Sequence, residues 1–235
     1  MWLSAPNIAC VHGFSTRHGG ISKPPFDTLN FGGHEDAPDA ISHNRNKALA
    51  VLGLNEDLVC RLKQVHGTTV HLATPGVLEG DGLVTNVPHL ALAIGTADCY
   101  PILFHDATNH VIGAAHAGWR GTVGKIVAEV LLQMRALGAN PATTQVAIGP
   151  GISTDKFEVG TDVLDQFVAA GFPSSCLHHR HINLASANQW VAEQAGVPKE
   201  NISINGRCST GPDFFSYRRD KGLTGRMWSV ICMSR

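Results

Sequence analysis

Residues 91–121 constrain the fold of this chain more than any other stretch. The segment reads ALAIGTADCYPILFHDATNHVIGAAHAGWRG and contains three apolar runs with turn residues between them. Short apolar runs bounded by turn residues are typical of buried strands. Cys99 lies between the first two runs, and His116 ends the third, just before Gly118. Functional sites are often built from such strand ends, so this stretch predicts strands that deliver reactive side chains to a site.

The rest of the chain alternates strand-like runs with helical patterns. The expected helices cover residues 40–52, 122–137, 162–170 and 184–195, and a glycine follows each one directly. Further strands are expected at residues 11–15, 58–65, 70–73, 83–85, 145–148, 202–204 and 227–233. No internal repeat or low-complexity linker interrupts the pattern. We therefore expect residues 1–235 to form a single α/β domain.

Composition excludes several classes of protein. Hydrophobic residues make up 43% of the chain and charged residues 16%, which excludes intrinsic disorder. The net charge is -1 and the basic residues are scattered, so neither nucleic acid nor an anionic membrane is an expected partner. No apolar run approaches the roughly 18 residues of a membrane helix, and the N-terminus does not resemble a signal peptide. We expect a cytoplasmic protein whose six cysteines, which form no CxxC pair, are free thiols.

Three residues could form a metal site. A catalytic zinc site takes three nitrogen, sulfur or oxygen ligands and leaves a fourth position open. His66, Cys99 and His116 fit this chemistry, because each ends an apolar run next to a turn or a glycine. Their spacing matches no local metal signature. From the residues alone, a metal site and a core cysteine with two strand-capping histidines both remain open.

Two acidic residues near these positions have simpler interpretations. Asp81 lies between two glycines, which favours a turn residue over a catalytic one. Asp98 precedes Cys99 and would point to the opposite face of an extended chain. We expect Asp98 to support the site or to form a turn rather than to bind a metal.

Three further segments look like functional motifs but lack the residues or the setting that those motifs require. Residues 118–125 are not a Walker phosphate loop, because Ile126 stands where serine or threonine is required. Residues 34–38 are not an HExxH zinc motif, because proline occupies the last position. The histidine-rich residues 178–181 lie in a polar connection and are expected to be a solvated surface.

Arginine-containing turns are candidates for anion binding. Residues 15–20 and 215–219, and the pair Trp119-Arg120, place guanidinium groups beside small or aromatic residues. This combination suits phosphate or a flat ring, although ordinary salt bridges explain it equally well.

Ordered sequence blocks run along nearly the whole chain, from about residue 10 to residue 231. They are GFSTRHGGIS (13–22), LNF (29–31), HNR (43–45), KQVHG (63–67), DGLVT (81–85), TADCYPILFHD (96–106), AAHAGWRGTVGKI (114–126), AIGPGI (147–152), FEVG (157–160) and FFSYRRDKGLTGR (214–226). Together they resemble the bacterial laccase-domain family, also called the multicopper polyphenol oxidase or peptidoglycan editing factor family. That family is similar to a domain described as a purine nucleoside phosphorylase.

The resemblance implies a fold and a site. The implied fold is a mixed β-sandwich flanked by helices. The implied zinc ligands, which are also the catalytic residues, are His66, Cys99 and His116, and none departs from the family pattern. One departure lies elsewhere, since Asp155 stands where many relatives are expected to carry a cysteine.

The implied activities are phosphorolysis of adenosine, inosine, guanosine and methylthioadenosine, and hydrolytic deamination of adenosine. Deamination needs a metal that lowers the pKa of its bound water, so that hydroxide can attack the purine. Phosphorolysis needs cationic donors around phosphate, for which the candidates are Arg17, Arg45, Arg120 and Arg218. The expected partners are purine nucleosides and phosphate, and the oligomeric state stays open.

Two other functions remain alternatives. A cysteine and two histidines also suit copper, as in a copper-dependent polyphenol oxidase (laccase). Multicopper oxidation, however, needs several coppers and many paired histidines, and His179 and His181 form the chain's only HxH pair. The third function, editing of peptidoglycan precursors, has no residue that points to it. Zinc and nucleosides are therefore favoured.

Overall fold

Two β-sheets form the centre of the computed structural model, which describes residues 1–33 and 35–234. The first six-stranded sheet has the order β1 (Trp2–Leu3), β2 (Val11–Ser15), β14 (Met227–Cys232), β7 (Ala91–Thr96), β3 (Val59–Lys63) and β5 (Gly76–Glu79). The second has the order β13 (Ile202–Ile204), β10 (Gln145–Ile148), β8 (Tyr100–Asp106), β9 (Val111–Ala117), β6 (Gly82–Thr85) and β4 (Val70–Leu72). Each sheet contains both parallel and antiparallel pairs.

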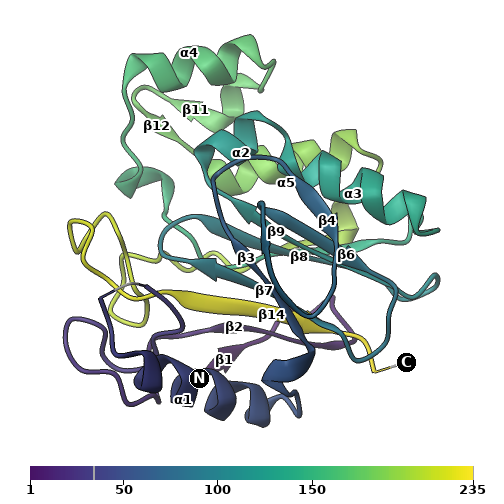
Figure 1. Cartoon of the computed structure of the whole chain (residues 1–235). Helices are drawn as coiled ribbons and strands as arrows, with labels where there is room; N and C mark the ends of the chain where they lie inside the picture. Colours follow the sequence, from purple (N-terminus) through teal and green to yellow (C-terminus); the bar gives the residue numbers. More distant parts are fainter. Residues whose placement is uncertain (34, 235) are drawn as a thin grey trace.

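Helices cover both outer faces of this sandwich (Figure 1). Helix α1 (Pro38–Val51) lies on the first sheet, and the other helices lie on the side of the second sheet. These are α2 (Trp119–Val123), α3 (Ile126–Ala136), α4 (Thr161–Ala169) and α5 (Leu184–Gln194). Short 3-10 turns occupy Glu56–Leu58, Thr154–Lys156, Ser174–Cys176 and Lys199–Asn201. The predicted mixed α/β sandwich flanked by helices is confirmed.

The central strands are apolar along their whole length because both of their faces are buried. In β7, Leu92 and Ile94 pack between the sheets, whereas Ala91 and Ala93 face the α1 side. In β8, Leu103 lies between the sheets, whereas Ile102 and Phe104 pack towards the helices that cover the second sheet. Alternate side chains of a strand point to opposite faces, so a layer covered on both sides needs a continuous apolar run.

The prediction of one helix over residues 122–137 is wrong. The chain forms α2 and α3 instead, and Lys125 between them has a left-handed backbone with φ of 61°. Gly124 packs closely on the loop between β3 and β4, and a Cβ at Gly124 would lie 2.6 Å from Thr68 Cγ2. A tertiary contact therefore breaks a segment whose apolar periodicity is continuous.

Three short structures were not predicted. Strand β1 pairs with β2, and β5 runs parallel to β3. Strands β11 (Leu177–His178) and β12 (His181–Ile182) form a small hairpin around the histidine-rich residues, and His178 and His179 are exposed, as predicted.

His34, which begins the excluded HExxH-like segment, lies outside the described residues, and Pro38 begins α1. None of the described helices is both long enough and apolar enough to cross a membrane.

Candidate metal centre

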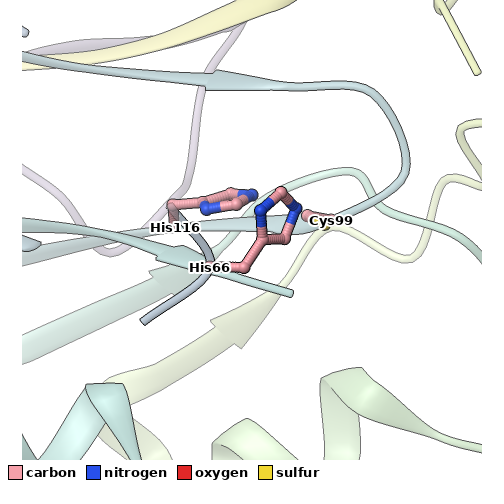
Figure 2. A group of neighbouring side chains, drawn as sticks. All are labelled: His66, Cys99 and His116. Atoms are coloured by element: carbon pink, nitrogen blue, oxygen red, sulfur yellow. The ribbon is translucent and has the colours of Figure 1, made fainter. Parts of the chain in front are cut away.

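The three residues proposed as metal ligands converge from three separate segments (Figure 2). His66 lies in the loop after β3, Cys99 in the turn between β7 and β8, and His116 near the end of β9. Their ligand atoms all lie within 4.8 Å of one another. Zinc takes nitrogen and sulfur ligands of this kind, at about 2.0–2.1 Å and about 2.3 Å. The three groups are therefore a candidate donor set for one ion, around which their ligand atoms would draw closer together.

Local backbone geometry directs these side chains. His66 and Asp98 have positive φ angles of 62° and 90°, which turn the chain sharply beside His66 and Cys99. Gly118 leaves no room for a side chain, because a Cβ there would lie 3.0 Å from Cys99 Sγ and 3.1 Å from His66 Cδ2. This close approach explains the glycine that follows the third apolar run.

Asp81 holds the base of the centre together. The carboxylate is fully buried and accepts a hydrogen bond of 2.8 Å from His116 Nδ1. It also accepts backbone N–H groups from His66 at 3.0 Å and from Gly67 at 2.7 Å. The turn interpretation of Asp81 is therefore incomplete, since one carboxylate links the two histidine segments.

The bond to Asp81 prepares His116 to bind a metal. A carboxylate only accepts hydrogen bonds when ionised, so Nδ1 carries the proton and Nε2 is left to face the centre. Metal-ligating histidines commonly donate their other ring N–H to a carboxylate, which fixes the ring and strengthens it as a ligand. The Asp81–His116 pair reproduces this arrangement.

The charges of the centre favour a thiolate. Burial raises the pKa of the Cys99 thiol, but the His116 and His66 imidazoles outweigh it and lower the pKa to about 6. Burial also disfavours the charged form of His116, yet Cys99 and Asp81 together raise its pKa to about 9. Nε2 therefore carries a proton at neutral pH, and a bound metal would displace that proton. Cys99 therefore presents the thiolate, which is the form of cysteine that binds metals.

A cleft of about 520 Å³ opens over the centre. It mixes polar, aromatic and cationic groups around the three proposed ligands, a composition suited to a small polar molecule with a flat ring. The lining residues are Gln64, His66, Gly95, Thr96, Ala97, Asp98, Cys99, His116, Ile152, Phe157, Tyr217, Arg218 and Arg226.

Three of the four candidate arginines are placed away from this cleft. Arg17 pairs with Asp27 at 3.0 Å and stacks on Phe215. Arg45 donates to the carbonyl of Phe31 and lies within 3.4 Å of a Glu56 carboxylate oxygen. These two guanidinium groups join segments of the fold.

Arg120 is exposed and stacks on Trp119, with its guanidinium carbon 4.4 Å from the ring centroid. Arg17, Arg45 and Arg120 are not among the described residues that line the cleft.

Arg218 is the candidate arginine that lines the cleft. Its Nη1 donates to the carbonyls of Lys156 and Glu158, and its guanidinium lies over Phe157. The backbone N–H of Arg218 donates to Asp98 at 2.7 Å.

Asp98 supports the cleft wall rather than the metal centre. Besides the bond from Arg218, its carboxylate accepts a hydrogen bond from Ser209 Oγ at 2.6 Å, and its carbonyl accepts from Ile152 N–H. Asp98 thus ties loops together and, among the described residues, makes no hydrogen bond to the metal-ligand candidates, which differs from the ligand-supporting role that the sequence suggested.

Two residues of the cleft were not singled out from the sequence. Gln64 exchanges two hydrogen bonds with the Gly95 backbone, at 2.7 and 2.8 Å, and so ties the His66 loop to the end of β7. Arg226 also lines the cleft. Its place at the end of the FFSYRRDKGLTGR block is the sequence feature that could have pointed to it.

Comparison with known proteins identifies the family. The family model described as multi-copper polyphenol oxidoreductase laccase matches residues 11–234. The chain belongs to this family. A Deinococcus radiodurans protein named purine nucleoside phosphorylase is 50% identical to it, over 99% of this chain and 93% of the relative. The Escherichia coli protein named purine nucleoside phosphorylase YfiH is 38% identical, over 98% and 96% of the two chains.

Solved structures of the family share the fold. The crystal structure of YlmD from Geobacillus stearothermophilus superposes with a TM-score of 0.91 at 33% identity and covers 98% of this chain and 94% of that one. A Bacillus licheniformis protein, YfiH, gives a TM-score of 0.89 at 32% identity, covering 94% and 92%. The laccase-domain resemblance is thus confirmed for both sequence and fold.

Proposed function

We propose that this chain is a zinc-dependent purine nucleoside enzyme. Its proposed reactions are phosphorolysis of adenosine, inosine, guanosine and methylthioadenosine, and hydrolytic deamination of adenosine. The observation that carries the proposal is the His66, Cys99 and His116 cluster, oriented by Asp81 at the base of a cleft. Relatives named purine nucleoside phosphorylase support the choice of substrate.

The donor set supports one zinc ion. Cys99 presents a thiolate, and His116 presents an Nε2 whose orientation is fixed from behind by Asp81. When bound, zinc supplies Lewis acidity and lowers the pKa of a coordinated water from about 15.7 towards about 7. The protein's own contribution is to hold the three ligands on separate segments, with His116 buried at the base of the cleft and His66 exposed.

The number of metal-capable groups argues against copper oxidation of phenols. Within the part of the chain that the structure describes, His66, Cys99 and His116 form the one cluster of three such residues. Multicopper oxidases need several such clusters, because they transfer electrons through several coppers to oxygen. The exposed histidines of the β11–β12 hairpin do not add a second cluster among these residues.

Phosphorolysis makes separate demands on the cleft. A phosphate oxygen forms a bond to the sugar carbon as the bond to the base breaks, and the base leaves with the electron pair and takes up a proton. Arg218 supplies a cation, and Phe157 and Tyr217 supply flat apolar surfaces at which a purine ring can pack. The cleft thus contains a cation for phosphate and aromatic surfaces for a purine.

A panel of purine nucleosides, incubated with and without phosphate, tests the proposal. The zinc-loaded parent protein should convert adenosine to adenine when phosphate is present and to inosine when it is absent. Cys99→Ala should lose both reactions by at least about a hundredfold, because the metal loses a ligand. Cys10→Ala, which alters a cysteine outside the cleft, is the matched control and should behave like the parent.

Two results would overturn this function. One is the absence of any nucleoside product from the zinc-loaded parent. The other is copper near one equivalent in protein purified without added metal, together with phenol oxidation that is lost in Cys99→Ala.

A further inference from the structure

We propose that Arg226 is the side chain that binds inorganic phosphate in the cleft above the metal centre. The proposal rests on the proposed function, since phosphate is the co-substrate of phosphorolysis. It adds a specific anion-binding residue to the site, at a position outside the four arginines that the sequence suggested.

The first observation is that Arg226 has no carboxylate partner. No Asp or Glu oxygen of residues 1–33 and 35–234 lies within 4.0 Å of its guanidinium nitrogens. Arg17, Arg45 and Arg219, by contrast, are paired with acidic side chains. Arg226 is therefore a cation of the cleft that no described carboxylate pairs with directly.

The second observation is that the guanidinium is partly buried. Burial lowers the pKa of Arg226, while the more distant negative groups, led by Cys99 and including Asp98, oppose that effect. Placing an unpaired charge in a poorly solvated position is unfavourable unless a counter-charge or hydrogen bonds compensate it. A bound anion would supply both.

The third observation is that the side chain is held in place before any anion arrives. Nη1 donates to the carbonyls of Thr224 and Gly225, each at 2.9 Å. The Arg226 backbone N–H donates to Asn30 Oδ1 at 2.8 Å, and its carbonyl accepts from Phe31 N–H. Fixing the group in advance reduces the entropy lost on binding.

The remaining donors suit phosphate. Within the described structure, Nε and Nη2 of Arg226 have no hydrogen-bond partner, and these two nitrogens lie on one edge of the planar guanidinium. An arginine edge of this kind binds two oxygens of a phosphate at once. The same cleft contains Cys99 and His116, so a phosphate held here lies in the compartment of the metal centre.

Phosphate binding and phosphate kinetics test this assignment on the zinc-loaded protein. We expect Arg226→Gln to weaken the binding of inorganic phosphate, measured by titration calorimetry, at least about tenfold. The KM for phosphate should rise by a similar factor and more than the KM for the nucleoside. Arg226→Lys keeps the charge without the two-donor edge and should fall between the parent and Arg226→Gln.

Arg135→Gln is the matched control, because it removes one positive charge from an exposed position on α3 away from the cleft. It should leave phosphate binding unchanged. Thermal unfolding of each variant verifies that the fold is intact.

The failure of this assignment is distinguishable from the failure of the proposed function. If the parent performs phosphorolysis and Arg226→Gln retains the parent's phosphate affinity and KM, Arg226 does not bind phosphate. If both KM values rise equally, the residue acts on the whole cleft, and the assignment is also wrong. If the parent binds phosphate through Arg226 but yields no free base, the anion site stands and the phosphorylase function falls.

Discussion

The base and the wall of the cleft are built in different ways. The base consists of His116 on β9 and Asp81 beside β6, both buried and joined directly to the sheet. The wall consists of loop residues 152–158 and 207–226, which Asp98 ties to the turn that carries Cys99.

This difference separates two tasks. A metal centre needs fixed ligand positions. Here a strand fixes His116, and the Asp81 carboxylate holds the loop that carries His66. Substrate recognition is commonly carried by loops on a rigid scaffold, since loops tolerate change without loss of the core. We infer that a change in the base affects chiefly metal affinity, whereas a change in the wall affects chiefly substrate affinity.

The largest effect is expected from Asp81→Asn in the base. The amide removes the negative charge that orients His116. Its NH2 group cannot accept the Val65 and Gly67 backbone N–H groups that Oδ2 receives. Loss of such a supporting partner typically lowers metal affinity roughly 10–100-fold. Competition with a chromophoric zinc chelator measures this affinity.

Asp106→Asn is the control for Asp81→Asn. Asp106 is equally buried and accepts several hydrogen bonds, but its partners are Thr108, Asn109 and Asn140, outside the cleft. This variant should lose stability while keeping the parent's zinc affinity. Equal loss of zinc affinity in the two variants would mean that Asp81 acts only through general stability.

A smaller effect is expected from Asp98→Asn in the wall. The amide weakens the hold on Ser209 and on the Arg218 backbone, and a hydrogen bond to a charged group contributes about 1.5–3 kcal/mol. We expect the nucleoside KM to rise roughly tenfold, the change that about 1.4 kcal/mol produces. Steady-state kinetics at saturating zinc measure it.

The zinc affinity of Asp98→Asn should be measured as well, for comparison with Asp81→Asn. It should stay within about twofold of the parent value, because Asp98 makes no hydrogen bond to the described ligand candidates. A loss of zinc without a change in KM would reverse the assignment of base and wall.

The clustering of His66, Cys99 and His116 was predictable from sequence, whereas much of what supports the cluster was not. His66, Cys99 and His116 stand beside turns or glycines at the ends of apolar runs and within familiar blocks, so each carries a local signal. Asp81 carries the signal of a turn, and its role depends on how loop and sheet meet in space. The break between α2 and α3 likewise depends on contact with Thr68, which no local pattern contains.

The arginines illustrate the same limit. The segments around Arg17 and Arg218 look alike in sequence, with a basic residue beside small and aromatic neighbours. In the fold, Arg17 is paired with Asp27, while Arg218 lines the cleft. Pairing partners decide whether a guanidinium holds the fold or faces a ligand, and those partners become visible only in three dimensions.

Removal and return of zinc tests the central claim most directly. Protein dialysed against a chelator should lose adenosine phosphorolysis, and activity should rise linearly as zinc is added back, levelling off at one equivalent per chain. His66, Cys99 and His116 are the ligands that would set this stoichiometry. Full activity in the metal-free protein, or no recovery with zinc, would contradict the account.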